Sequence, residues 1–412
     1  MTDSAALDRI AALDLVRGIA VLGILTINVA SFAGGPTATL SPSLLGPASA
    51  ADGFAFAGGL VLFEGKMRGL FTLLFGASML LFVDRRDAAG KDGGYIQLRR
   101  LGWLLLIGYA HQLLLWSGDI LMLYALLAPI ALALRHLSVR QMVIMAVSFF
   151  MLWHLAFTLA GWSSLTAAEA IHRGTADPAT QAAVMGQLAA ITVDAQNEIQ
   201  VLRQPYFTML AERFAETLYQ PFQVTLLSIG ETVPLMLLGM ALFRSGFFTG
   251  GWQRAQLWRL ALAGLALGLP LAALQAWWGW SRGYPPEAMY ELLMGPAGPP
   301  HLALTLAWAA LLVLAAPALL PTWLGERLRA AGRMALSNYL LTSLVMAFCF
   351  FGWGLGLVGQ VGAAQQWWFV LLGWAVMLAW SKPWLERFRQ GPVEWLWRSL
   401  TEGQRLPFKR LL

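Results

Sequence analysis

The chain has 412 residues, of which 58% are hydrophobic and only 12% are charged, and its formal net charge is +6. A soluble domain needs roughly 25% charged residues to cover its surface, so this composition excludes an ordinary soluble enzyme. The single cysteine, Cys349, excludes an intramolecular disulfide and a cluster of thiolate metal ligands, and no metal site is expected. Because the basic residues flank apolar segments, the positive charge indicates a membrane protein and no nucleic-acid partner.

Apolar stretches long enough to cross a bilayer recur from end to end, and a spanning helix needs about 20 such residues. The hydropathy pattern predicts about ten spans, at 15–34, 56–82, 99–116, 119–135, 140–161, 223–243, 256–279, 301–320, 335–357 and 366–382. The sequence therefore predicts an all-α, polytopic integral membrane helical bundle. We expect a single transmembrane domain over 1–382, with the lipid bilayer as its main partner.

The distribution of lysine and arginine predicts the orientation of the chain. If the N-terminus is cytoplasmic, 22 of the 28 basic residues fall on the inner side and four, all arginines, fall outside. Cytoplasmic loops carry such an excess of basic residues in membrane proteins. We therefore expect both termini in the cytoplasm, a helical external loop at 162–222 and a basic amphipathic cytoplasmic tail at 383–412.

Several ionisable residues lie inside the predicted spans, where they are costly and often functional, although a role in helix packing is the alternative for each. Asp14, Arg17 and Asn28 fall within roughly 60° of one another on a helix and form one polar stripe. Glu64 and Arg68 are spaced to pair on one helix face. Lys66 points away from Glu64 and lacks that partner, so it is either a site residue or a lysine reaching the membrane interface.

A histidine and a carboxylate are separated by a very short connection between two spans. His111 lies near the end of one helix and Asp119 opens the next, with Tyr124 further along it. A carboxylate beside a histidine fixes its tautomer and raises its basicity, so the two residues are a candidate general base and its orienting group. The alternative roles are a helix cap for Asp119 and a packing role for His111.

Three further polar residues complete the candidate set. Glu231 has no cation nearby in the sequence, so it must find one on another helix or stay protonated. Arg333 and Asn338 open the ninth span beside the basic inner loops, where they are suited to hold an anion entering from the cytoplasm; simple snorkelling is the alternative for Arg333. Since the chain contains no Walker lysine motif, HExxH or GxSxG, ATP-driven transport, metalloproteolysis and serine hydrolysis are not indicated.

Four segments resemble the YeiB-like family of bacterial membrane proteins: RIAALDLVRGIAVLGILTIN, EGKMRGLFTLLFG, the stretch from His111 to Ala125, and GRMALSNYLLTS. This resemblance implies a location in the plasma (bacterial inner) membrane. The first segment is also distantly similar to membrane-bound acyltransferases of the heparan-α-glucosaminide N-acetyltransferase type. Those enzymes move an acetyl group from cytoplasmic acetyl-CoA to a sugar on the far side, using a histidine that follows their first span.

Between residues 31 and 52 this chain has no histidine, so His111 would take that role from another helix. On the resemblance, the positions that matter most are Arg17, Asn28, Lys66, His111, Asp119 and Asn338.

Two functions follow as alternatives. The first is an acyltransferase that uses acetyl-CoA or another acyl-CoA, with His111 as base, Asp119 orienting it, and Lys66 or Arg17 stabilising negative charge. The second is a secondary transporter of a small solute or a lipid-linked substrate, with protons relayed by Glu231, Lys66 and His111. A cavity that opens on the inner side at Arg333 and leads to His111 would favour the enzyme. A pocket closed at both ends near the middle of the bilayer would favour the transporter.

Overall fold

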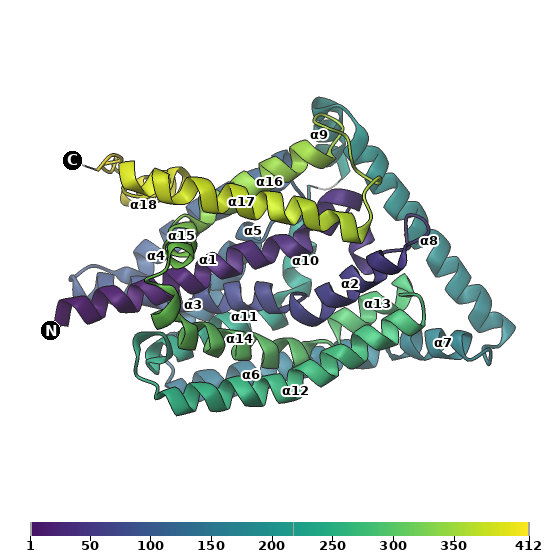
Figure 1. Cartoon of the computed structure of the whole chain (residues 1–412), viewed down its shortest axis with the longest axis horizontal. Coiled ribbons are helices and arrows are strands. Elements are labelled where there is room, and N and C mark those ends of the chain that lie inside the picture. Colours follow the sequence, from purple (N-terminus) through teal and green to yellow (C-terminus); the bar gives the residue numbers. More distant parts are fainter. Residues whose placement is uncertain (1, 217, 411–412) are drawn as a thin grey trace.

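The computed structural model describes residues 2–216 and 218–410, and these are nearly all helical. Most of the long helices run roughly along the longest axis of the molecule (Figure 1). The first half of the chain forms α1 (Thr2–Gly34), η1 (Thr37–Leu40), α2 (Ala50–Leu62), α3 (Lys66–Ala88), α4 (Gly93–Leu114), α5 (Leu121–Ala133), α6 (Val139–Ala160), α7 (Trp162–His172), α8 (Pro178–Arg203) and α9 (Tyr206–Glu216). The second half forms α10 (Gln220–Leu227), α11 (Ile229–Arg244), η2 (Phe247–Thr249), α12 (Arg254–Ser281), α13 (Pro286–Met294), α14 (Gly298–Leu319), α15 (Trp323–Arg333), α16 (Ala335–Phe350), α17 (Ala363–Arg387) and α18 (Pro392–Glu402).

The expected class of fold, an all-α helical bundle with several candidate spans, is confirmed. Within the described residues, six helical segments are long and apolar enough to cross a membrane, and up to eight if each of two bent helix pairs counts as one span. The two remaining expected spans, 99–116 and 119–135, correspond to α4 and α5. With 13 residues, α5 is about 20 Å long, shorter than the roughly 30 Å of a hydrocarbon core. The count of ten therefore stays a prediction.

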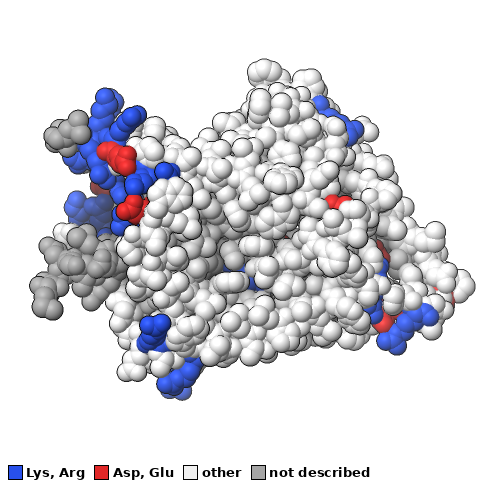
Figure 2. All heavy atoms as spheres, viewed as in Figure 1, with Lys and Arg blue, Asp and Glu red and all other residues white. Residues whose placement is uncertain are grey.

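Charge is concentrated at the end of the molecule that holds both termini. Figure 2 shows basic and acidic side chains gathered at this end, a smaller group at the opposite end, and a lateral face between them that is almost free of charge. This is the distribution expected of a protein whose middle contacts lipid. We refer to the end with the termini as the basic end; its position in the cytoplasm remains a prediction.

The expected external loop and tail are both largely helical. The segment 162–222 contains α7, α8, α9 and the start of α10, apart from residue 217, which lies outside the described residues. In the expected tail, α17 continues to Arg387 before the chain turns into α18, and the tail's boundary at 383 stays a prediction. Contacts with α4 and α16 hold α18 against the bundle. Residues 411–412 are not described.

Three interruptions in the helices position the polar residues. The chain breaks between α2 and α3 at Gly65, whose φ of 73° lies in the left-handed region that favours glycine. It bends by 62° between α10 and α11 and by 88° between α15 and α16. A broken helix leaves backbone groups without partners inside the same helix, and these must find other partners or line a wet cavity.

Close packing of α1 against α15 holds the basic end together. A Cβ atom on Gly332 would lie 1.8 Å from the Asp14 carbonyl oxygen, and one on Gly18 would lie 1.9 Å from that of Leu328. Only glycine permits such an approach of two backbones. The approach brings Asp14 and Arg17 on α1 next to Arg333 at the end of α15.

Candidate functional site

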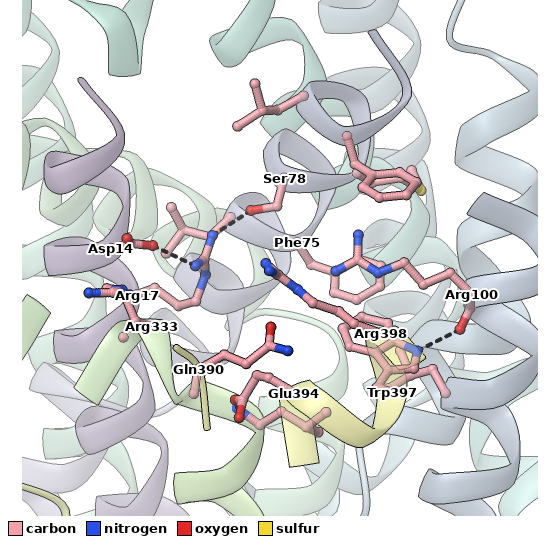
Figure 3. Close-up of a pocket in the computed structure, with 18 of the residues that line it drawn as sticks. Asp14, Arg17, Phe75, Ser78, Arg100, Arg333, Gln390, Glu394, Trp397 and Arg398 are labelled. Carbon is pink, nitrogen blue, oxygen red and sulfur yellow. Dashed lines mark hydrogen bonds and ion pairs between the residues drawn. The ribbon is translucent and has the colours of Figure 1, made fainter. Parts of the chain in front are cut away.

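A cavity of about 430 Å³ opens at the basic end, between α1, α3, α4, α15, α16 and the tail. Figure 3 shows polar side chains lining it from several of these elements. Its basic lining consists of Arg17, Arg85, Arg100, Arg333, Arg389 and Arg398, against the two carboxylates Asp14 and Glu394. This excess of arginine makes the mouth suited to phosphate and carboxylate groups, which arginine binds through two parallel hydrogen bonds.

Arg17 is held by partners on two helices. Its Nη1 donates to Asp14 Oδ1 at 2.8 Å, one turn earlier on α1, and its Nη2 donates to Ser78 Oγ on α3 at 2.7 Å (Figure 3). The side chain of Arg17 is 24% exposed, so part of the guanidinium still faces the cavity. A pre-positioned cation of this kind can bind an anion with little loss of side-chain entropy.

The tail helix α18 forms one wall of the cavity. Glu394 Oε1 accepts hydrogen bonds from the backbone N–H groups of Leu336 and Ser337, at 2.8 and 3.0 Å, and so caps the N-terminus of α16. Trp397 Nε1 donates to the Arg100 carbonyl oxygen at 2.8 Å, and the Arg100 guanidinium lies 4.0 Å from the centre of the Trp397 ring. These contacts join the tail to the bundle over the mouth of the cavity.

Burial changes the protonation behaviour of two residues on α18. It raises the pKa of the Glu394 carboxyl above its usual value, although the hydrogen bonds from Ser337 act in the opposite direction. It also lowers the pKa of the Arg398 guanidinium, against the attraction of Glu394. The tail therefore carries charged groups that are partly removed from water, and such groups respond strongly to a ligand of opposite charge.

Deeper inside, the lining of the cavity becomes apolar and aromatic. Phe71, Phe75 and Tyr124 form part of it, and Leu121 and Tyr339 lie beside them. A second cavity, of about 520 Å³, shares Phe82, Arg85, Arg100 and Arg398 with the first. The space thus has a charged mouth and an apolar interior, which suits an elongated ligand with anionic groups at one end.

His111 and Asp119 form a hydrogen-bonded pair behind this apolar interior. The short connection folds α5 back on α4, and His111 Nδ1 lies 2.8 Å from Asp119 Oδ1. The other carboxylate oxygen accepts the backbone N–H of Met122 at 2.7 Å, which fixes the carboxylate at the start of α5. Both residues are buried, and His111 Nε2 has no hydrogen-bond partner among the described residues.

The pair is separated from the cavity by a tyrosine. The ring of Tyr339, which lines the cavity, is 5.3 Å from the His111 ring between centroids, and its hydroxyl accepts the N–H of Ile120 at 3.2 Å. A carboxylate that accepts from Nδ1 leaves Nε2 with a free lone pair. His111 is therefore arranged as a base, one side chain away from the floor of the cavity.

Two predicted site residues have structural partners instead of facing the cavity. Lys66 is fully buried, and its ammonium donates to the Leu60 carbonyl oxygen at 2.5 Å, in the last turn of α2. Asn338 joins the α15–α16 bend to α17: its Nδ2 donates to Ala331 O and Ser381 Oγ, both at 3.0 Å, and its Oδ1 accepts from Trp380 Nε1 at 2.7 Å. Asn28 is half-buried on α1 and lines neither cavity.

Arg68 pairs with a different residue from the one that its spacing predicts. The expected partner was Glu64, but the chain breaks between the two residues, and Arg68 Nη2 instead lies 2.9 Å from Glu231 Oε2 on α11. Glu231 thus finds its cation on another helix. Of the predicted site residues, Arg17, Tyr124 and Arg333 line the cavity of the basic end, and His111 and Asp119 lie behind its floor.

The sequence did not single out several cavity residues: Ser78, Tyr339, Arg389, Gln390, Glu394, Trp397 and Arg398. Most belong to the tail, which the sequence predicts only as a basic amphipathic segment. The spacing of Glu394, Trp397 and Arg398 on one side of a short amphipathic helix was the available signal, but it does not say what that side contacts. No group of three or more metal-ligating side chains gathers within the part of the chain that the structure describes.

The helices and the cavity define a polytopic α-helical membrane protein with an arginine-rich site at one end. A family model described as "Protein of unknown function (DUF418)" matches residues 242–404. The chain is 32% identical over 414 residues to "Uncharacterized protein YxaH" of Bacillus subtilis (strain 168), covering 96% of this chain and 94% of that protein. It is 30% identical over 407 residues to "Uncharacterized protein YeiB" of Escherichia coli (strain K12), covering 96% and 97%.

The matches to YxaH and YeiB run nearly the full length of each protein, and the chain belongs to the YeiB-like family. No solved structure gives a significant match.

Proposed function

We propose that this protein is a transmembrane acyltransferase that takes an acyl group from acyl-CoA and transfers it to an acceptor on the other side of the membrane. The observation that carries the proposal is the cavity at the basic end, with arginines at its mouth and Tyr339 at its floor, directly in front of the His111–Asp119 pair. This arrangement matches the two parts of the donor, a polyanionic nucleotide and an uncharged pantetheine arm.

In this proposal the arginines of the mouth hold the phosphates of CoA, and the pantetheine arm extends along Phe75 and Phe71 toward Tyr339. A movement of the Tyr339 side chain then opens the way from the cavity to His111, so that the thioester comes to lie beside the imidazole. His111 Nε2 accepts the proton of the acceptor hydroxyl or amine as that atom attacks the thioester carbonyl. The carbon–sulfur bond breaks, the CoA thiolate leaves, and the imidazolium returns the proton to it. Asp119 keeps Nε2 unprotonated at the start and stabilises the imidazolium.

The proposal is tested with the full chain in lipid nanodiscs. Acetyl-CoA should bind with an affinity that falls as the salt concentration rises, because salt screens the attraction between the arginines and the phosphates. His111→Ala should keep this binding and lose acyl transfer, because the base acts after the donor is bound. His136→Ala is the matched control, since His136 is exposed and lies between α5 and α6. Absence of acetyl-CoA binding to the wild type, or full transfer by His111→Ala, would refute the proposal.

A secondary transporter is the second candidate, and the broken helices favour it. The interruptions before α3 and before α11 bring Arg68 and Glu231 together within the bundle, as in carriers whose substrate site lies at interrupted helices. Proton-coupled uptake of a solute into proteoliposomes without any acyl-CoA would support this function and contradict the acyltransferase.

A further inference from the structure

The Arg68–Glu231 pair forms a second polar site, separate from the cavity of the basic end. Arg68 Nη2 and Glu231 Oε2 are 2.9 Å apart, across the closely packed helices α3 and α11. Neither residue lines the two cavities described above.

The exposure of this pair shows that it faces open space. The side chain of Arg68 is 44% exposed and that of Glu231 is 16% exposed, although α3 packs against α1, α4, α11 and α14. A guanidinium exposed to hydrocarbon would cost several kcal/mol, so this space must hold water or a polar ligand. Figure 2 shows a few basic atoms in a hollow near the middle of the otherwise uncharged lateral face, so part of the interior is open from the side.

Further polar groups surround the pair. Glu64 lies at the break before α3, and His301 on α14 packs against Gly65, where an added Cβ would lie 2.1 Å from the imidazole Nδ1. The two carboxylates, Glu64 and Glu231, equal the two cations, Lys66 and Arg68, in number, so the site favours a ligand that it can bind through hydrogen-bonding groups.

The open space around Arg68 and Glu231, which we call the Arg68–Glu231 crevice, lies next to the floor of the cavity. The side chain of Tyr124 separates the two. Tyr124 lines the cavity, and its hydroxyl is 2.5 Å from Thr72 Oγ1. Thr72 Oγ1 donates in turn to the Arg68 carbonyl oxygen at 2.8 Å. Because α3 carries Ser78, Phe75 and Phe71 along the cavity and Arg68 beyond them, one helix face connects the basic mouth to the crevice.

We infer that the Arg68–Glu231 crevice binds the hydroxyl-bearing acceptor of the acyl group; this rests on the proposed acyltransferase function. A carboxylate accepts the hydrogen bond that a hydroxyl group donates, and a guanidinium donates hydrogen bonds to the oxygen of a hydroxyl group. The acceptor comes either from a membrane lipid whose headgroup carries free hydroxyls, entering from the lateral side, or from a free polyol. Donor and acceptor would then bind on opposite sides of the Tyr124 ring, so a movement of Tyr124 as well as Tyr339 would bring the acceptor hydroxyl, the thioester and His111 together.

The test measures acceptor binding and donor binding separately, on the full chain purified in detergent. Short-chain phosphatidylglycerol carries two free hydroxyls in its headgroup, short-chain phosphatidylcholine carries none, and glucose represents a free polyol. Binding is followed by the change in tryptophan fluorescence. We expect phosphatidylglycerol or glucose to bind at least about tenfold more tightly than phosphatidylcholine, which corresponds to a difference of about 1.4 kcal/mol.

The decisive variant is Arg68→Gln combined with Glu231→Gln, which removes both charges and leaves two side chains that can hydrogen-bond each other. Arg68→Ala alone would leave Glu231 without its cation and is the less informative choice. Arg259→Ala is the matched control, since Arg259 is exposed on α12. The double variant should bind phosphatidylglycerol and glucose at least about tenfold more weakly, bind acetyl-CoA as the wild type does, and lose acyl transfer.

Equal binding of these probes by the wild type and the double variant would overturn the inference, as would a wild type that binds neither phosphatidylglycerol nor glucose more tightly than phosphatidylcholine. If the wild type bound phosphatidylglycerol or glucose through these residues but did not bind acetyl-CoA, the crevice would stand and the acyltransferase would fall. Preference for phosphatidylglycerol over glucose identifies the lipid as the source of the hydroxyl, and the reverse identifies a free polyol.

Discussion

Replacing Asp119 by asparagine changes the chemistry of His111 with little change in shape. In the wild type, Asp119 Oδ1 accepts from His111 Nδ1, and Oδ2 accepts the Met122 N–H at 2.7 Å. In the variant, the amide oxygen keeps the Met122 hydrogen bond, and the amide NH₂ then faces Nδ1. Because an NH₂ group donates, Nδ1 must accept and the ring proton moves to Nε2. Nε2, which has no hydrogen-bond partner among the described residues, would no longer be a base.

The expected magnitude follows from the part that a general base plays in the reaction. Such a base contributes about 10²–10⁴-fold to the rate, or about 3–5 kcal/mol of activation free energy. The fold should lose much less, because asparagine caps a helix about as well as aspartate does. Asp119→Ala removes the cap as well and should cost about 1 kcal/mol more in unfolding free energy than Asp119→Asn.

The assay is release of the CoA thiol from acetyl-CoA by the reconstituted protein in total bacterial lipid, alongside thermal unfolding of the same preparations. We expect Asp119→Asn to lose at least about a hundredfold in rate with a nearly unchanged unfolding midpoint. The double variant with His111→Ala should be no slower than His111→Ala alone, since both changes remove one base. An Asp119→Asn protein that unfolds earlier but turns over normally would show that the pair only supports the structure.

Three further predictions concern packing, the tail and the buried lysine. Gly332→Ala should destabilise the protein by about 1–3 kcal/mol, because its Cβ would meet the Asp14 backbone. Gly102→Ala is the control, since Gly102 lies in open space within α4 and an added Cβ meets no other atom there. Chemical denaturation of the two variants in detergent compares their unfolding free energies. Since the pKa of Glu394 is raised when the tail is docked, docking takes up a proton and should strengthen as pH falls toward the ordinary carboxyl range. Limited proteolysis of the tail should therefore be slower at about pH 5 than at about pH 8, and Glu394→Gln should abolish the difference. Lys66→Met should lower the unfolding free energy, measured by chemical denaturation, by about 1–3 kcal/mol through loss of the Leu60 hydrogen bond. If the variant's rate of acyl transfer per folded molecule fell by more than about threefold, Lys66 would instead take part in the reaction.

The sequence by itself determined the helical class, most of the helix positions and the separation of charge between the two ends. These features depend on local hydropathy, because each span must be apolar over its own length whatever its neighbours are. The neighbourhood of His111 and Asp119 was also predictable, since only a short turn separates their helices.

Only the tertiary structure decided which charged groups meet. Arg68 pairs with Glu231 instead of Glu64 because the helix breaks at Gly65, and the expected pairing assumed a continuous helix. Glu394 reaches the N-terminus of α16 because α18 folds back on the bundle, which its amphipathic pattern alone does not indicate. A side chain inside a membrane protein must find a polar partner somewhere, but the identity of that partner depends on how distant helices pack, and the local sequence does not contain this information.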